Sequence, residues 1–265
     1  MKNRFPYIFS TLAIVLILEI ISRVYYSQNE LDRIMEIIIP EPDLLWITRP
    51  NLKTFFNGVR IETNSYGFRD SEITTKKKKR IIIMGPSSAF GWGIEKEKIY
   101  SSLLFEKLKD KFETINASVI GYSSYQGRIL FEKKIKELNP DIIIFAYGAN
   151  DVDRYRFFYN NEFEDNELKN TSNFSTHFQN FMRKSFLIKS LDRLSSKFRD
   201  YRINTKPRVS LKNFIDNIEY LNKKSRELNF NLVLMTTSFL KPPDYNKYKE
   251  CDENKIKKCL NVSKI

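Results

Sequence analysis

The sequence predicts an α/β fold in which a parallel sheet lies between layers of helices. Short, uniformly apolar segments each run into a polar loop that contains glycine, and segments with helical spacing separate them. The clearest is Arg80–Ile94, where four apolar residues precede Gly85. Such a run, without polar alternation, is typical of a strand buried on both faces. Strands that alternate with helices favour a parallel sheet.

Three further segments continue this pattern. The second strand is predicted over Thr114–Ile120, the third over Asp141–Tyr147 and the fourth over Asn229–Thr237. Apolar residues at helical spacing between 100 and 112, between 129 and 138, and between 211 and 221 predict the connecting helices. No apolar run follows Thr237, so we expect the fourth strand to be an unpaired edge that invites a partner chain.

Three polar groups follow the first three strands. Ser87 comes directly after the first, Gly121 ends the second, and Asn150 follows the third. Because parallel strands end at one edge of the sheet, these residues are predicted to converge there. A serine hydroxyl is a candidate nucleophile, and a backbone N–H and a carboxamide can stabilise an oxyanion. This combination indicates acyl transfer.

The chain resembles the SGNH (GDSL-type) esterase family in three short segments. The first three sequence blocks of that family are matched, in the same order, by Gly85–Ser87, Gly121 and Gly148–Asp151. The resemblance implies a flavodoxin-like, three-layer fold with strand order 2-1-3-4-5, in which the fifth strand is absent here. It implies Ser87 as the nucleophile, with its own N–H, Gly121 and Asn150 forming the oxyanion hole. Neither a cofactor nor a metal ion is expected.

The resemblance covers Asn64–Thr237, and Asn64–Arg69 is similar to the lead-in of membrane-anchored members. It implies an ester hydrolase that acts on acyl esters, acetyl esters in particular, of an envelope glycan or lipid. Three alternatives stay open: an O-acyltransferase on the same scaffold, a non-catalytic glycan-binding or assembly module, and a flavodoxin-like domain whose loops match by chance.

Two departures from the family pattern bear on activity. Pro86 stands where the family has Asp or Gly, and its effect on Ser87 is open. The Asp-x-x-His block that supplies the general base is missing, so the domain is expected to be C-terminally incomplete. His177 is the single histidine, and Phe174 occupies the position where that block would need Asp. A packing or surface histidine is the favoured interpretation, and a substitute base is the alternative.

The chain is predicted to consist of an anchor over 1–26, a lead segment over 27–79 and an SGNH-like domain over 80–265 with an insertion at 152–208. Phe5–Leu18 is uncharged, and an extension past Glu19 reaches the length of a membrane span. No small-residue cleavage site follows, which favours a signal anchor over a removed signal peptide. Lys2 and Arg4 favour a cytoplasmic N-terminus and a domain on the periplasmic side of the inner membrane.

The net charge of +13 does not indicate nucleic-acid binding. The lysines are scattered, and many lie beside glutamates, as on a solvated helix face. The dense run 76–80 leads into a strand. Attraction to anionic lipid or acidic glycan is a weaker alternative. Cys251 and Cys259 are eight residues apart and form either a disulfide or two free thiols, since no histidine lies near them to complete a metal site.

Overall fold

The computed structural model describes residues 5–25, 30–56, 58–152, 164–167, 182, 184–196 and 206–236. His177, Cys251 and Cys259 lie outside these ranges. The chain divides into two compact units. The smaller comprises Met1–Trp46 and Asn170–Arg202, and the larger comprises Ile47–Lys169 and Ile203–Ile265.

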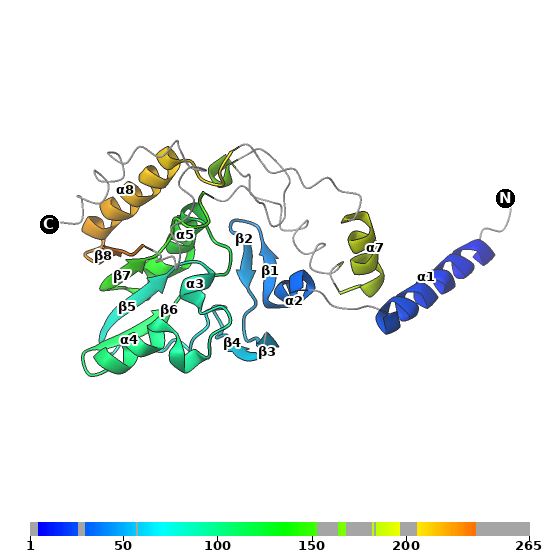
Figure 1. Ribbon diagram of the computed structural model, residues 1–265, viewed down its shortest axis with the longest axis horizontal. Helices are drawn as coiled ribbons and strands as arrows, with labels where there is room; N and C mark the ends of the chain where they lie inside the picture. The colour runs from blue at the N-terminus through cyan, green and yellow to red at the C-terminus, as the bar shows by residue number, and fades with distance from the viewer. Residues whose placement is uncertain are drawn as a thin grey trace. The chain divides into compact units, whose positions relative to one another are not determined.

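A four-stranded parallel sheet forms the centre of the larger unit (Figure 1). Its strands are β5 (Lys79–Met84), β6 (Phe112–Asn116), β7 (Ile142–Phe145) and β8 (Asn231–Leu234). They lie in the order β6-β5-β7-β8, and every neighbouring pair is parallel. This confirms the predicted fold class and the order of its first four strands.

Helices cover both faces of the sheet. They are α3 (Ser87–Phe90), α4 (Tyr100–Leu108), α5 (Ser124–Leu130) and α8 (Leu211–Glu227). On one face, Ile81 and Ile83 pack with Ala89 of α3 and with residues of α4. Ile82 lies between them in the strand, so it faces the opposite side of the sheet, and it is fully buried. Helices α5 and α8 lie on that side (Figure 1). The apolar runs that predicted the strands therefore fill a core on each side.

Shorter elements complete the larger unit. After α5 the chain continues through a π-helical stretch at Phe131–Ile135 and a 3-10 turn at Lys136–Leu138. Two other 3-10 turns span Lys96–Lys98 and Asp165–Glu167. In the lead segment, β3 (Lys53–Phe56) and β4 (Val59–Glu62) form an antiparallel hairpin.

The smaller unit contains α1 (Phe5–Tyr25), α2 (Glu30–Ile37), β1 (Ile38–Glu41) and α7 (Phe186–Ser196), and β1 pairs with β2 (Leu45–Thr48). Within α1, the stretch from Tyr7 to Tyr25 is long and apolar enough to cross a membrane, and none of it is buried in the protein. This is the segment in which the sequence predicts an anchor.

Strands β6 and β8 differ from their predicted forms. β6 ends at Asn116, although the backbone pairing with β5 continues to the N–H of Val119, which donates to Gly85 O at 3.0 Å. β8 was expected to be buried on both faces, but Val233 is 45% exposed. Val233 pairs with Ile144 and lies on the same face of the sheet. Helix α4 covers this face, but it packs mainly against β6, at the opposite edge of the sheet from β8.

Candidate active site

The three loops predicted to carry the site leave the same edge of the sheet from adjacent strands. At the end of β5, the carbonyl of Met84 accepts a hydrogen bond from Ala146 N at 2.8 Å, and that of Gly85 accepts one from Val119 N at 3.0 Å. The end of β5 is therefore aligned with the segments that follow β7 and β6 on either side of it. Gly85 lies at this point, two residues before Ser87. The edge so formed is the one at which open α/β sheets bind ligands.

Ser87 is the first residue of the short helix α3. It is half-buried, whereas the neighbouring Ser88 is exposed. Pro86 is extended, with φ −83°, and occupies the N-cap position, and its carbonyl accepts hydrogen bonds from Ala89 N and Phe90 N. A missing N–H costs nothing at this position, so Pro86 is compatible with a serine at the start of the helix.

Helix α3 lies unusually close to the sheet because residue 85 is glycine. A Cβ atom at Gly85 would lie 2.6 Å from Ala89 Cβ and 3.2 Å from Ala146 Cβ. Asn116, at the end of β6, also donates from Nδ2 to Ala89 O at 3.1 Å. These contacts fix the turn that presents Ser87.

The lead segment holds the other end of α3. The buried guanidinium of Arg69 donates to the carbonyls of Phe90, at 3.3 Å, and Gly91, at 2.5 Å. It also donates to Arg60 O, at 3.0 Å, and Ile94 O, at 2.8 Å. The motif at Asn64–Arg69 thus contributes a side chain that connects the β3–β4 hairpin to the helix carrying Ser87, a role that its sequence did not reveal.

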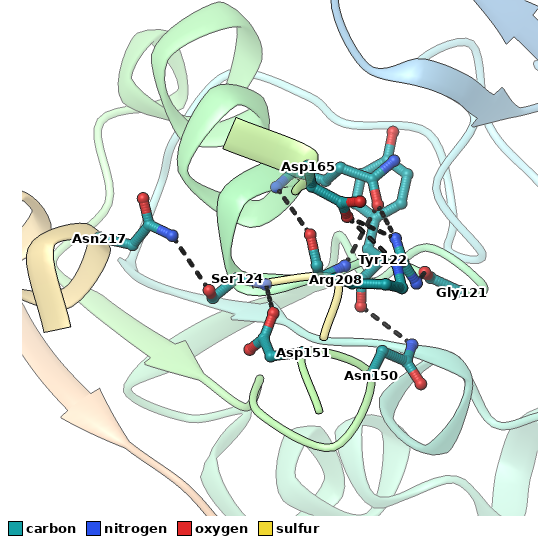
Figure 2. Close-up of polar contacts among 10 residues, drawn as sticks. Gly121, Tyr122, Ser124, Asn150, Asp151, Asp165, Arg208 and Asn217 are labelled. Carbon is teal, nitrogen blue, oxygen red and sulfur yellow. Dashed lines mark hydrogen bonds and ion pairs between the residues drawn. The ribbon is translucent and has the colours of Figure 1, made fainter. Parts of the chain in front are cut away.

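Gly121 and Asn150 lie on neighbouring loops joined by a direct contact. Gly121 has φ +75°, a conformation that favours glycine. Asn150 Nδ2 donates to the carbonyl of Tyr122 at 3.0 Å (Figure 2). Within the described part of the chain, neither the N–H of Gly121 nor the hydroxyl of Ser87 has a hydrogen-bond partner. The structure thus brings Gly121 and Asn150 together and places Ser87 at the same sheet edge.

The loop after Gly121 is fixed by a capping box at the start of α5. Ser123 Oγ accepts from Gln126 N, and Gln126 Oε1 accepts from Ser123 N. The pattern Ser-x-x-Gln at 123–126 is a sequence signal for this cap. The cap sets where the Gly121 loop ends and α5 begins.

Arg208 lies behind this loop in a buried cluster. Its guanidinium donates to Gly121 O at 2.7 Å and to Asp165 Oδ2 at 2.7 Å (Figure 2). It also donates to Gln126 Oε1 at 2.8 Å. Asp165 and Arg208 are 43 residues apart in the sequence, within the predicted insertion or at its end. No local pattern pairs residues at that separation, so sequence reasoning missed them both.

Asp151 follows Asn150 and is buried beneath the site. Its Oδ1 accepts a hydrogen bond from Ser124 N at 2.7 Å, and among the described residues its Oδ2 is buried without a partner. Burial raises the pKa of Asp151 from 3.8 to about 7. Ser124 Oγ in turn accepts from Asn217 Nδ2 at 3.1 Å (Figure 2). Asp151 therefore connects the third loop to the start of α5.

Comparisons with known proteins found similar folds at low sequence identity. No family model matches the chain, and no curated protein does. Similar solved structures include TesA (15% identity, TM-score 0.44, covering 70% of this chain and 75% of that one). Another is the psychrotrophic esterase EstA from Pseudoalteromonas sp. (17% identity, TM-score 0.42, covering 70% of this chain and 74% of that one). A third is a catalytic mutant of the acetylxylan esterase Axe2 from Geobacillus stearothermophilus (13% identity, TM-score 0.41, covering 72% of this chain and 75% of that one).

Proposed function

We propose that this chain is an ester hydrolase of the SGNH type that removes acyl groups, acetyl groups in particular, from a glycan or lipid of the cell envelope. The observation that carries the proposal is the register of β5 with its two neighbours. That register places the loops of Ser87, Gly121 and Asn150 side by side at the carboxyl edge of the sheet. Function at such an edge is decided by the groups it presents.

Each of the three groups has a role in this proposal. Ser87 Oγ attacks the acyl carbonyl carbon, and its proton passes to the departing alcohol as the ester bond breaks. The N–H groups of Ser87 and Gly121 and the carboxamide of Asn150 stabilise the oxyanion. Water then attacks the acyl-serine, which releases the carboxylic acid and restores the hydroxyl. Support comes from Asn150, whose carboxamide is already held against the Gly121 loop.

The general base is the open part of this mechanism. The sequence contains one histidine, His177, which lies outside the described residues. Without a base, Ser87 stays a neutral alcohol at pH 7, and positioned acid–base catalysis contributes about 10²–10⁴-fold. We therefore expect slow turnover from the 265-residue chain.

The proposed location is a membrane surface. Helix α1 would anchor the chain in the inner membrane with a single span, and the substrates would be acyl esters of a glycan or lipid on the periplasmic side. Support comes from the length and apolar character of α1 and from its lack of burial in the protein.

The decisive experiment uses adjacent serines as a matched pair. The full chain is assayed in detergent with a chromogenic acetyl ester and labelled with a serine-reactive phosphonate. We expect Ser87→Ala to abolish both turnover and labelling, and Ser88→Ala to leave both near the level of the parent chain. Labelling that survives Ser87→Ala and is lost in Ser88→Ala would overturn the assignment of the nucleophile.

The acceptor and the base are tested in the same assay. A product acylated on an added sugar, formed at the expense of free acetate, would identify an O-acyltransferase instead. Absence of any turnover that depends on Ser87 would leave a non-catalytic glycan-binding or assembly module. If turnover reaches about 10 per second, a typical enzymatic rate, and is lost in His177→Ala, His177 supplies the base.

A further inference from the structure

Helix α7 and the membrane-length helix α1 are joined through one carboxylate. Glu19, in the second half of α1, accepts hydrogen bonds from Ser185 Oγ at 2.8 Å and from the backbone N–H groups of Phe186 and Leu187, each at 3.0 Å. These donors belong to the first turn of α7 and the residue before it. Glu19 thus occupies the N-terminus of a helix from a segment more than 160 residues away in the sequence.

This contact accounts for an acidic residue within a mostly apolar helix. An acidic side chain inside a bilayer is costly, most of all at the centre of the bilayer, unless partners satisfy it. The first N–H groups of a helix lack partners within that helix and favour a negative charge. Glu19 also accepts a hydrogen bond from Arg23 Nε at 3.2 Å, so its carboxylate is satisfied by groups of this chain.

The depth of the contact follows from helix geometry. Glu19 lies six residues before Tyr25, the last residue of α1. At 1.5 Å per residue, this places the start of α7 about 9 Å along the axis from the end of the helix. Surface-bound amphipathic helices bury their apolar face about 5–10 Å into the boundary between headgroups and acyl chains. If α1 spans the membrane and its end at Tyr25 lies at the surface, the start of α7 lies at that boundary.

The side chains of α7 match that location. Leu191 and Leu194, one turn apart on the same side of the helix, are 56% and 55% exposed. Lys189 lies about 150° around the axis from both, and its Nζ is 4.8 Å from the centre of the Phe186 ring. Arg23 of α1 lies over the same ring at 5.0 Å. Cations beside an aromatic ring, with leucines turned away from them, are typical of an interfacial helix.

We propose that α7 is an amphipathic helix that lies in the membrane interface, with Leu191 and Leu194 in contact with phospholipid acyl chains, and that Glu19 fixes it there by capping its N-terminus. This rests on the anchoring role proposed for α1. The occupant of the exposed leucine face is the bilayer in which α1 is inserted, because α7 begins at the depth where that bilayer changes from acyl chains to headgroups.

The test uses the full chain in vesicles of phosphatidylcholine and phosphatidylglycerol. Single cysteines at 16, 189 and 194, in a background with Cys251→Ser and Cys259→Ser, carry an environment-sensitive fluorophore. Nitroxide-labelled lipid probes contact with acyl chains, and aqueous iodide probes contact with water. We expect lipid quenching at 16 and 194, and iodide quenching at the matched position 189 on the opposite side of α7.

The label at 16 separates failure of this inference from failure of the anchor. No lipid quenching at 16 would refute membrane insertion of α1, and the inference with it. Lipid quenching at 16, with position 194 open to iodide or shielded from both quenchers, would refute the interfacial placement of α7 alone. We also expect Glu19→Gln to reduce lipid quenching at 194 by at least half and to leave position 16 unchanged. An unchanged signal at 194 would exclude Glu19 as the group that fixes α7.

Discussion

Arg208 and Asp165 form a buried ion pair in which Arg208 Nη2 lies 2.7 Å from Asp165 Oδ2 and each side chain is 2% exposed. The same guanidinium donates to the carbonyl of Gly121. A backbone hydrogen bond from Asp165 N to Arg208 O, at 2.7 Å, strengthens the link. This pair therefore connects two distant segments of the chain to the loop proposed to bind the oxyanion.

The first prediction concerns loss of that pair. Asp165→Asn removes the carboxylate that pairs with the buried Arg208 guanidinium, so we expect the free energy of unfolding to fall by about 3–5 kcal/mol. Denaturant unfolding measures the change. Glu167→Gln is the matched control, because Glu167 is an exposed carboxylate in the same 3-10 turn, and its effect should stay within about 0.5 kcal/mol. Equal effects of the two substitutions would show that the pair is not the stabilising contact.

The second prediction concerns the contact between α3 and the sheet. Gly85→Ala places a methyl group 2.6 Å from Ala89 Cβ. We therefore expect the free energy of unfolding to fall by about 1–3 kcal/mol. We also expect Ser87-dependent turnover to decrease. Adding Ala89→Gly removes the contact with Ala89 Cβ, which is closer than that with Ala146 Cβ. It should restore part of the stability and part of the turnover. Thermal unfolding and the ester assay provide the measurements. A Gly85→Ala variant as stable as the parent chain would be incompatible with this packing.

The third prediction is a pH dependence due to Asp151. The folded protein keeps a proton on this carboxyl up to about pH 7, whereas the unfolded chain releases it near the ordinary pKa of 3.8. Unfolding therefore releases a proton between these values, and the free energy of unfolding decreases as the pH rises through this window. The full effect is about 4 kcal/mol.

Asp151→Asn should remove this dependence, because the amide does not titrate. We expect the stability of the parent chain, relative to the variant, to decline from pH 4 to pH 8. The control is Asp216→Asn, which removes an exposed carboxylate of α8. Parallel stability–pH curves for the parent chain and Asp151→Asn would contradict the assignment.

The fourth prediction concerns the edge of the sheet. Asn231 N donates to Asp141 O, just before β7, and Met235 N donates to Phe145 O in β7. Successive N–H groups of a strand point to opposite sides, so Asn231, Val233 and Met235 direct theirs toward β7. The N–H groups of Leu232 and Leu234 point to the other side, where no strand among the described residues pairs with β8. Hydrogen exchange should be faster at Leu232 and Leu234 than at Val233 and Met235. Equal, strong protection of all four in a monomer would show that another segment covers this edge.

The sequence by itself determined the parallel sheet and the edge at which Ser87, Gly121 and Asn150 lie, whereas the order of the four strands was implied only by the resemblance to the SGNH family. These features follow from local patterns, because an apolar run specifies a buried strand and the glycine after it specifies where the strand ends. The sequence also located the membrane-length helix, since hydropathy and length are properties of one continuous segment.

Only the tertiary structure decided which distant side chains support that edge. Arg69 reaches the end of α3, and Arg208 reaches Gly121. Each of these contacts joins a charged side chain to backbone groups of a segment remote in sequence. The local sequence around such a residue does not distinguish it from a charged residue on the surface. The partners of such groups are set by where the packed elements bring the chain together, because a buried charge must find hydrogen-bonding groups there.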